Sequence, residues 1–139
     1  MLIDKENLFS NAQALTATAA STNLIDLGAA NRDIGKANIR FRAQVDTTFL
    51  SGGSSTLTLA LQTDSTSSFG SATALYTSPA IAKASLVAGY VAVDIAVPRG
   101  VKRYLRVNYT VGTADFTAGA LTAFLAEQTE GRQDYPNAI

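Results

Sequence analysis

The stretch "NIRFRAQV" (residues 38–45) alternates between apolar and polar side chains. From Ile39 to Val45 every second residue is apolar, and the residues between them are two arginines and a glutamine. Successive side chains of a β-strand point to opposite faces, so one face of this stretch suits a core and the other suits solvent. The pattern predicts a half-buried antiparallel strand.

The same period of two recurs along the chain. It is clear in "STLTLALQT" (55–63), "YVAVDIAV" (90–97) and "RYLRVNYTVG" (103–112), and weaker in "GALTAFLAE" (119–127). Shorter candidate strands lie at 14–19, 23–27 and 73–78. Several short strands separated by turn signals are typical of a sandwich or jelly roll. We therefore expect an all-β fold: a single-domain, jelly-roll-like antiparallel β-sandwich of about eight strands.

Glycines and small polar residues mark the turns. "LSGGSST" (50–56) predicts a hairpin turn in which Gly52 and Gly53 take positive φ. Helix signals are weak: "GAANRDIGKAN" (28–38) fits one helical turn, and "IAKASLVAG" (81–89) fits either a helix or a strand.

The 139 residues favour one domain, and no repeat or linker divides them. Both ends mix charges with single large apolar residues, as docking arms do. We expect a sandwich over residues 13–126, an N-terminal arm over 1–12 and a C-terminal arm over 127–139.

Charge and composition exclude several classes of function. The formal net charge is zero, which argues against a dedicated nucleic-acid binder. No apolar run approaches the ~20 residues of a membrane span, and charges at residues 4–6 interrupt any secretory signal. The chain has no His and no Cys, which removes the usual metal ligands and the commonest general base. We expect no enzyme activity, no cofactor, no metal site and no small-molecule substrate.

The one concentration of charge lies in "VPRGVKRYLRVNYTVG" (97–112). Four of the eleven basic residues fall here. Read as a strand, its core face is interrupted only by Arg103, and Lys102, Tyr104 and Arg106 lie on the outer face. Such a stripe suits a solvated sheet face, a protein interface or single-stranded nucleic acid, and the zero net charge makes the last the least favoured.

Several stretches together resemble a known family: "MLIDKENLFSNAQALTATAAS", "NLIDLG", "RDIG", "LVAGY", "VPRGVKRYLRVNYTVG", "TAGALTAFL" and "YPNA". In this order, from end to end, they look like the capsid cement (decoration) proteins of tailed bacteriophages, the small podovirus-associated family. The resemblance implies a jelly roll on the outer surface of the virion capsid, made in the host cytoplasm. It also implies a homo-oligomer, a dimer or trimer, that bridges subunits of the major capsid protein and stabilises the expanded shell.

The family supplies no catalytic or ligand residues, so the expected contacts follow from the two arms and the basic strand. They are Leu2, Ile3, Leu8, Phe9, Lys102, Tyr104, Arg106, Tyr135 and Ile139. Alternatively, Phe9 and Tyr135 close the ends of the sandwich. The alternative functions are another virion part, in head completion or the tail, and a carbohydrate-binding jelly roll. The absence of Trp disfavours the carbohydrate module.

Overall fold

The computed structural model describes residues 5–28 and 39–127. The elements in these ranges are η1 (Lys5–Asn7), β1 (Leu8–Ala14), β2 (Ala19–Ala20), β3 (Ile25–Asp26), β4 (Ile39–Leu50), β5 (Thr56–Asp64), β6 (Thr73–Thr77), β7 (Ile81–Ala82), η3 (Lys83–Ser85), β8 (Val91–Ala96), β9 (Tyr104–Gly112) and β10 (Ala118–Glu127). None of the helices in these ranges is long and apolar enough to cross a membrane.

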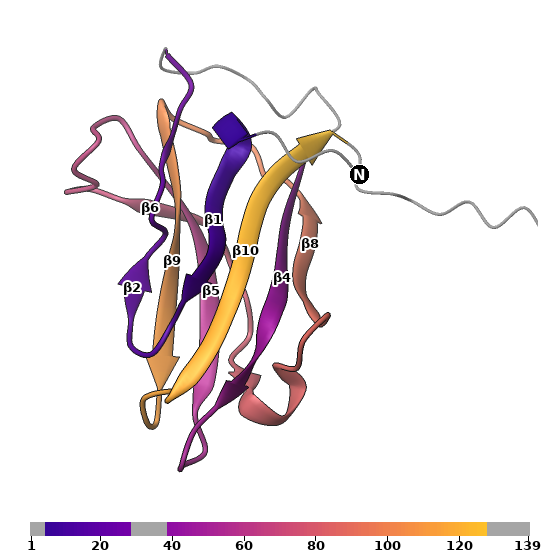
Figure 1. The fold of residues 1–139 in the computed structure, drawn as a ribbon. Helices are drawn as coiled ribbons and strands as arrows, with labels where there is room; N and C mark the ends of the chain where they lie inside the picture. Colours follow the sequence, from indigo (N-terminus) through magenta and orange to yellow (C-terminus); the bar gives the residue numbers. More distant parts are fainter. Residues whose placement is uncertain (1–4, 29–38, 128–139) are drawn as a thin grey trace, which may run out of the picture.

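The strands form two antiparallel sheets packed face to face (Figure 1). Sheet A has the order β1-β10-β4-β8, and sheet B has the order β2-β9-β5-β6, with β3 also beside β9 and β7 beside β5. If β2 with β3, and β6 with β7, each count as one interrupted edge strand, eight strand positions result. Numbered along the chain, they read 1-8-3-6 in sheet A and 2-7-4-5 in sheet B. This is the strand order of a jelly roll, so the predicted fold is confirmed.

The core lies between the two sheets, and β5 and most of β9 alternate in burial as their sequences predict, whereas residues 123–126 of β10 are all buried. In β5 the side chains of Leu57, Leu59 and Leu61 are fully buried, and those between them are half-buried. One buried polar link joins the two layers across the core. The Ser10 hydroxyl of β1 lies 2.7 Å from the Tyr109 hydroxyl of β9.

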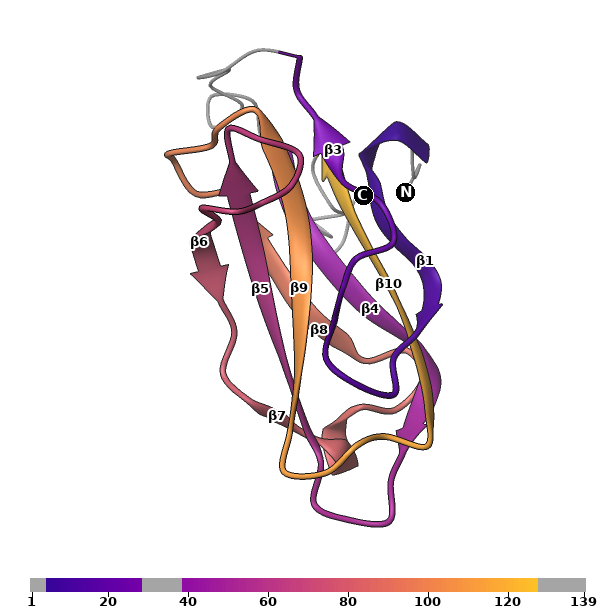
Figure 2. The same cartoon turned by 90° about the vertical axis from the view of Figure 1, so that its left-hand side faces the viewer.

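The predicted hairpin at residues 50–56 is wrong. The strand before it, β4, belongs to sheet A, and the strand after it, β5, belongs to sheet B, so this connection crosses from one layer to the other (Figure 2). Neither Gly52 nor Gly53 has a positive φ. Two successive half-buried strands can face the same core in two ways, as neighbours in one sheet or as strands of opposite sheets. The alternation of apolar and polar residues is the same in both arrangements, so it does not distinguish them.

The predicted arms also need correction. Residues 8–12 belong to β1, which pairs with β10 from Leu8 opposite Phe124 onward. Phe9 is fully buried and packs edge-on against Phe41, with ring centroids 5.9 Å apart. Glu127, expected in the C-terminal arm, ends β10. Phe9 therefore fits the alternative role of closing the sandwich, because its ring fills the core beside Phe41.

The remaining expectations have mixed outcomes. The ambiguous stretch 81–89 holds both a short strand, β7, and a single 3-10 turn, η3. The helical turn predicted within 28–38 lies outside the described residues, as do residues 1–4 and 128–139.

Candidate interaction surface

The outer face of sheet B carries most of the predicted basic stripe. Along β9, Leu105, Val107 and Tyr109 are fully buried, whereas Tyr104 and Arg106 lie on the opposite face and are half-buried. The two faces predicted for this strand are thus confirmed from residue 104 onward. Asn108 and Thr110 continue the outer face toward the end of β9, and both are short.

Arg106 is held by two neighbours from other parts of the chain. Its Nε–H donates to Oε1 of Gln62 in β5, at 2.9 Å. Its guanidinium carbon lies 4.4 Å from the ring centroid of Phe69, a cation–π distance. Gln62 stands opposite Arg106 in the β5–β9 register, whereas Phe69 comes from the connection between β5 and β6. The side chain is therefore fixed by two contacts that leave its outer edge accessible.

The β5–β6 connection is organised by Asp64, the last residue of β5. One oxygen of its carboxylate accepts the backbone N–H groups of Ser65 (2.6 Å) and Thr66 (3.3 Å), and the other accepts that of Ser71 (2.9 Å). The Ser71 hydrogen bond is the main reason that the pKa of Asp64 is lowered, against burial, which raises it. Phe69 sits inside this loop with positive φ (53°). The loop thereby folds back over sheet B, and Figure 2 shows it passing in front of β9.

Arg103 is not on the core face, where the strand pattern placed it. It precedes β9 and is paired with Asp26 of β3, through Nε to Oδ1 (2.9 Å) and Nη2 to Oδ2 (3.1 Å). Its guanidinium also lies 5.0 Å from the ring centroid of Tyr104. The hydrogen bond with Arg103 lowers the pKa of Asp26 and raises that of Arg103. This pair fastens the short strand β3 to β9 at the sheet edge.

Lys102 lies beside the same end of sheet B and is half-buried. Its backbone N–H donates to Oγ1 of Thr63 (2.8 Å), and that hydroxyl donates to the carbonyl of Tyr104 (2.9 Å). The structure therefore brings Lys102, Tyr104 and Arg106 to one end of one sheet.

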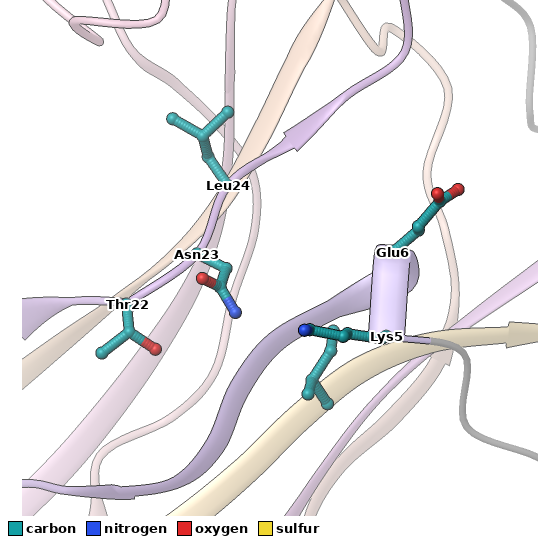
Figure 3. A pocket seen from close by; sticks show the side chains of 6 residues that line it. Lys5, Glu6, Thr22, Asn23 and Leu24 are labelled. Carbon is teal, nitrogen blue, oxygen red and sulfur yellow. The ribbon is translucent and has the colours of Figure 1, made fainter.

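A second candidate surface is a shallow depression at the upper end of the sandwich, where β1 begins. Its lining residues are Lys5, Glu6, Leu8, Thr22, Asn23 and Leu24. Figure 3 shows Lys5 pointing across the depression toward Asn23, with Glu6 turned away. Leu8 is half-buried here and Leu24 is 42% exposed. Of the predicted N-terminal contacts, Leu8 lies on this surface, while Leu2 and Ile3 fall outside the described residues, as do Tyr135 and Ile139.

On the outer face of sheet A the arginines are paired with a carboxylate, unlike Arg106 on sheet B. Arg40 Nε lies 2.8 Å from Oδ1 of Asp94, and Arg42 Nη1 lies 3.3 Å from its Oδ2. One carboxylate of β8 thus serves two arginines of β4. In the parts of the chain that the structure describes, no three His, Cys, Asp or Glu side chains gather where a metal ion could bind.

A family model, Bbp16, matches residues 9–125. The chain belongs to the Bbp16 family. The match runs from Phe9 in β1 to Leu125 in β10 and so includes both sheets. No curated protein matches the chain.

Sequence reasoning missed a third surface of this Bbp16 chain, at the lower end of the sandwich where β4 ends. Leu50 is 55% exposed, Val87 47% and Tyr90 37%. They lie on adjacent segments, because Phe49 N–H donates to the Leu86 carbonyl (2.9 Å) and Val45 N–H to that of Tyr90 (2.9 Å). A signal was present in "TFLSGG": Phe49 and Leu50 are consecutive, so only one of them can face the core of a strand.

Proposed function

We propose that this chain is a capsid cement protein. In this role it binds the outside of an icosahedral phage head as a homo-oligomer, a dimer or trimer. It bridges subunits of the major capsid protein and thereby stabilises the expanded shell. The proposal is supported by the sequence resemblance, which runs along the whole chain, and by surfaces suited to protein contacts.

The observation that carries the proposal is the position of the exposed large apolar side chains. Leu24 lies at the upper end of the sandwich, and Leu50, Val87 and Tyr90 lie at the lower end. A protein that bridges two neighbours needs two separated contact surfaces on a scaffold that does not bend. A jelly roll provides such a scaffold, because its long strands run between the two ends and are hydrogen-bonded on both sides in the middle of each sheet.

Mass action gives the energetic reason. A protein that binds the expanded shell, and not separated subunits, stabilises the shell by RT ln(1 + [L]/Kd) per site. When one end is bound, the second contact becomes intramolecular, and the avidity exceeds either single contact by about 10²- to 10⁴-fold. Modest apolar contacts at each end are then sufficient.

The experiment is binding of the purified full chain to expanded, DNA-free heads that lack it, followed by co-sedimentation and electron microscopy. The wild-type chain should decorate the outer surface. Leu24→Ser at one end, and Leu50→Ser with Val87→Ser at the other, should each weaken binding by at least about tenfold, because each removes the gain from bridging. Ala74→Ser, an exposed change on β6, is the matched control and should bind as the wild type does.

Two results would oppose this function. One is a folded wild-type chain that does not bind heads, which would redirect attention to glycan ligands and to tail proteins. The other is a variant altered at both ends that decorates heads as tightly as the wild type, which would show that bridging does not use these side chains.

A further inference from the structure

Arg106 is set apart from the other half-buried arginines by its lack of a carboxylate. Arg40 and Arg42 share Asp94, and Arg103 is paired with Asp26. Within the described ranges, Arg106 forms no ion pair, and its two contacts are a neutral amide and an aromatic ring. A partly desolvated guanidinium interacts more strongly with an anion than a fully hydrated one does, because the surrounding dielectric is lower.

The contacts of Arg106 also fix which of its atoms are available. The Nε–H of Arg106 is used by Gln62, and the Phe69 ring centroid lies 4.4 Å from the guanidinium carbon. The two Nη groups have no hydrogen-bond acceptor among the residues that the structure describes. Two Nη groups in one plane match the two oxygens of a carboxylate. The side chain therefore presents a preformed fork and loses little rotamer freedom on binding.

Phe69 reaches Arg106 only because of the loop that Asp64 organises. Phe69 is 7% exposed, yet it lies outside the hydrophobic core cluster, since it covers the outer face of sheet B and not the inner one. Its positive φ of 53° is unfavourable for a bulky residue and is maintained by the surrounding loop. Three backbone N–H groups bound to Asp64 supply that support. Asp64 is thus a positioning residue for the Phe69–Arg106 contact.

The surroundings of Arg106 indicate what it binds. Asn108 and Ala60 are the next outward residues along β9 and β5, and both are short, so a partner surface can approach closely. Asp26 and Asp64 flank Tyr104 in the adjacent row, and Asp26 is paired with Arg103, so acidic residues lie among the cations at this end of sheet B. A nucleic acid needs a row of available cations that follows its phosphates, whereas here Arg103 is paired with Asp26 and Asp64 lies beside Tyr104. A single protein carboxylate fits the site better.

We propose that Arg106, held by Gln62 and Phe69 and positioned through Asp64, binds the carboxylate of an Asp or Glu side chain on the surface of the major capsid protein. This inference rests on the cement function proposed above. It adds a polar anchor on sheet B, distinct from the apolar contacts at the two ends of the sandwich.

The test measures binding of the full chain to expanded, DNA-free heads at physiological salt. Arg106→Gln should weaken binding about 10- to 100-fold, as expected for an arginine that becomes buried in the interface with its partner. Arg106→Lys should also weaken it, because a lysine keeps the charge but loses the fork. Arg99→Gln removes the same charge from an exposed turn and should stay within about twofold of the wild type. All variants are compared only after circular dichroism shows wild-type folding.

Two further arms test the chemistry and the positioning. Heads whose surface carboxylates are converted to amides with a carbodiimide and glycinamide should bind the wild type no more tightly than they bind Arg106→Gln. Phe69→Leu and Asp64→Asn should each weaken binding to untreated heads, yet add little in combination with Arg106→Gln, because they act through that side chain.

The outcomes separate this inference from the proposed function. Wild-type binding together with unaltered binding of Arg106→Gln overturns the anchor and leaves the cement function standing. Wild-type binding that survives amidation, while Arg106→Gln remains weak, overturns the carboxylate and points to another acceptor. Failure of the wild type to bind untreated heads overturns both.

Discussion

Gly119 provides a sharp test of the fold because it lies where β10 approaches the core most closely. Its φ is +141°, and a Cβ built on it would lie 2.4 Å from Cδ1 and 2.5 Å from Cγ of Phe49. The register of β10 against β4 shifts at this point, between Ala118 and Ala120, as at a β-bulge. Phe49 cannot easily move aside, because it is 1% exposed and packs edge-on against Phe116 with ring centroids 4.8 Å apart.

Gly119→Ala should therefore be strongly destabilising. The strained φ costs about 1–3 kcal/mol, and forcing a methyl group into a packed core costs about 1–3 kcal/mol more. The sum is about 4 kcal/mol, which for a domain of this size lowers Tm by roughly 15 °C. Urea unfolding followed by far-ultraviolet circular dichroism measures the loss, and two-state analysis is appropriate for a single domain.

Two other glycines separate the two contributions. Gly89 has φ of +89° with nothing within 4 Å of its Cβ position, so Gly89→Ala should show the backbone cost alone, about 1–2 kcal/mol. Gly52 has open space and no positive φ, so Gly52→Ala should stay near wild-type stability or gain about 0.5 kcal/mol. If Gly119→Ala proves no more costly than Gly89→Ala, then β10 does not press against Phe49 and the bulge is misplaced.

Three further predictions concern stability. Tyr109→Phe removes the Ser10–Tyr109 hydrogen bond and should lower the free energy of unfolding, measured in urea, by about 1 kcal/mol. The double variant Ser10→Ala with Tyr109→Phe should lose less than the sum of the two single losses, and strict additivity would show that the hydrogen bond is not formed. The hydrogen bond with Arg103 lowers the pKa of Asp26 in the folded protein, so the ionised carboxylate stabilises the fold above its unfolded pKa, and this contribution is lost as pH falls through the folded pKa. Asp26→Asn should therefore make the free energy of unfolding depend less steeply on pH in the acid range, and an unchanged slope below about pH 4 would contradict this. Phe9→Ala should cost about 3–5 kcal/mol because the ring is fully buried in the core, whereas a near-neutral result would return residue 9 to an arm.

The strands that could be predicted are those in which one physical requirement dominates. Between Arg40 and Val45 and again through Leu57–Leu61, burial alternates residue by residue, so the period of two is visible in the sequence. The first strand was missed because its pattern is broken. The register of β1 against β10 shifts twice, the polar residue Ser10 is buried and hydrogen-bonded to Tyr109, and Ala12 has positive φ. Bulges move side chains from one face to the other and erase the alternation on which the prediction depends.

The candidate surface shows the same division. The outward position of Arg106 follows from the alternation in β9, but its partners do not. Phe69 lies 37 residues earlier in a loop of serines and glycine, and its contact depends on how Asp64 folds that loop. The carboxylate of Asp64 binds backbone N–H groups of this loop, a role that composition alone does not reveal.

The zero net charge of the chain illustrates why bulk electrostatics is a poor guide to partners. The charges sum to zero over the whole chain, and part of this cancellation is local. Asp94 lies within 3.3 Å of both Arg40 and Arg42 on sheet A, and Asp26 is paired with Arg103 at the edge of sheet B. At Arg106, by contrast, no carboxylate of the described residues forms an ion pair. What a partner encounters at short range is the unpaired group, because a Debye length of about 8 Å at physiological salt screens the remainder. A chain of zero net charge can therefore present a specific cationic contact. We expect Arg106 to be that contact, because Gln62 and Phe69 hold its side chain in place without neutralising its charge.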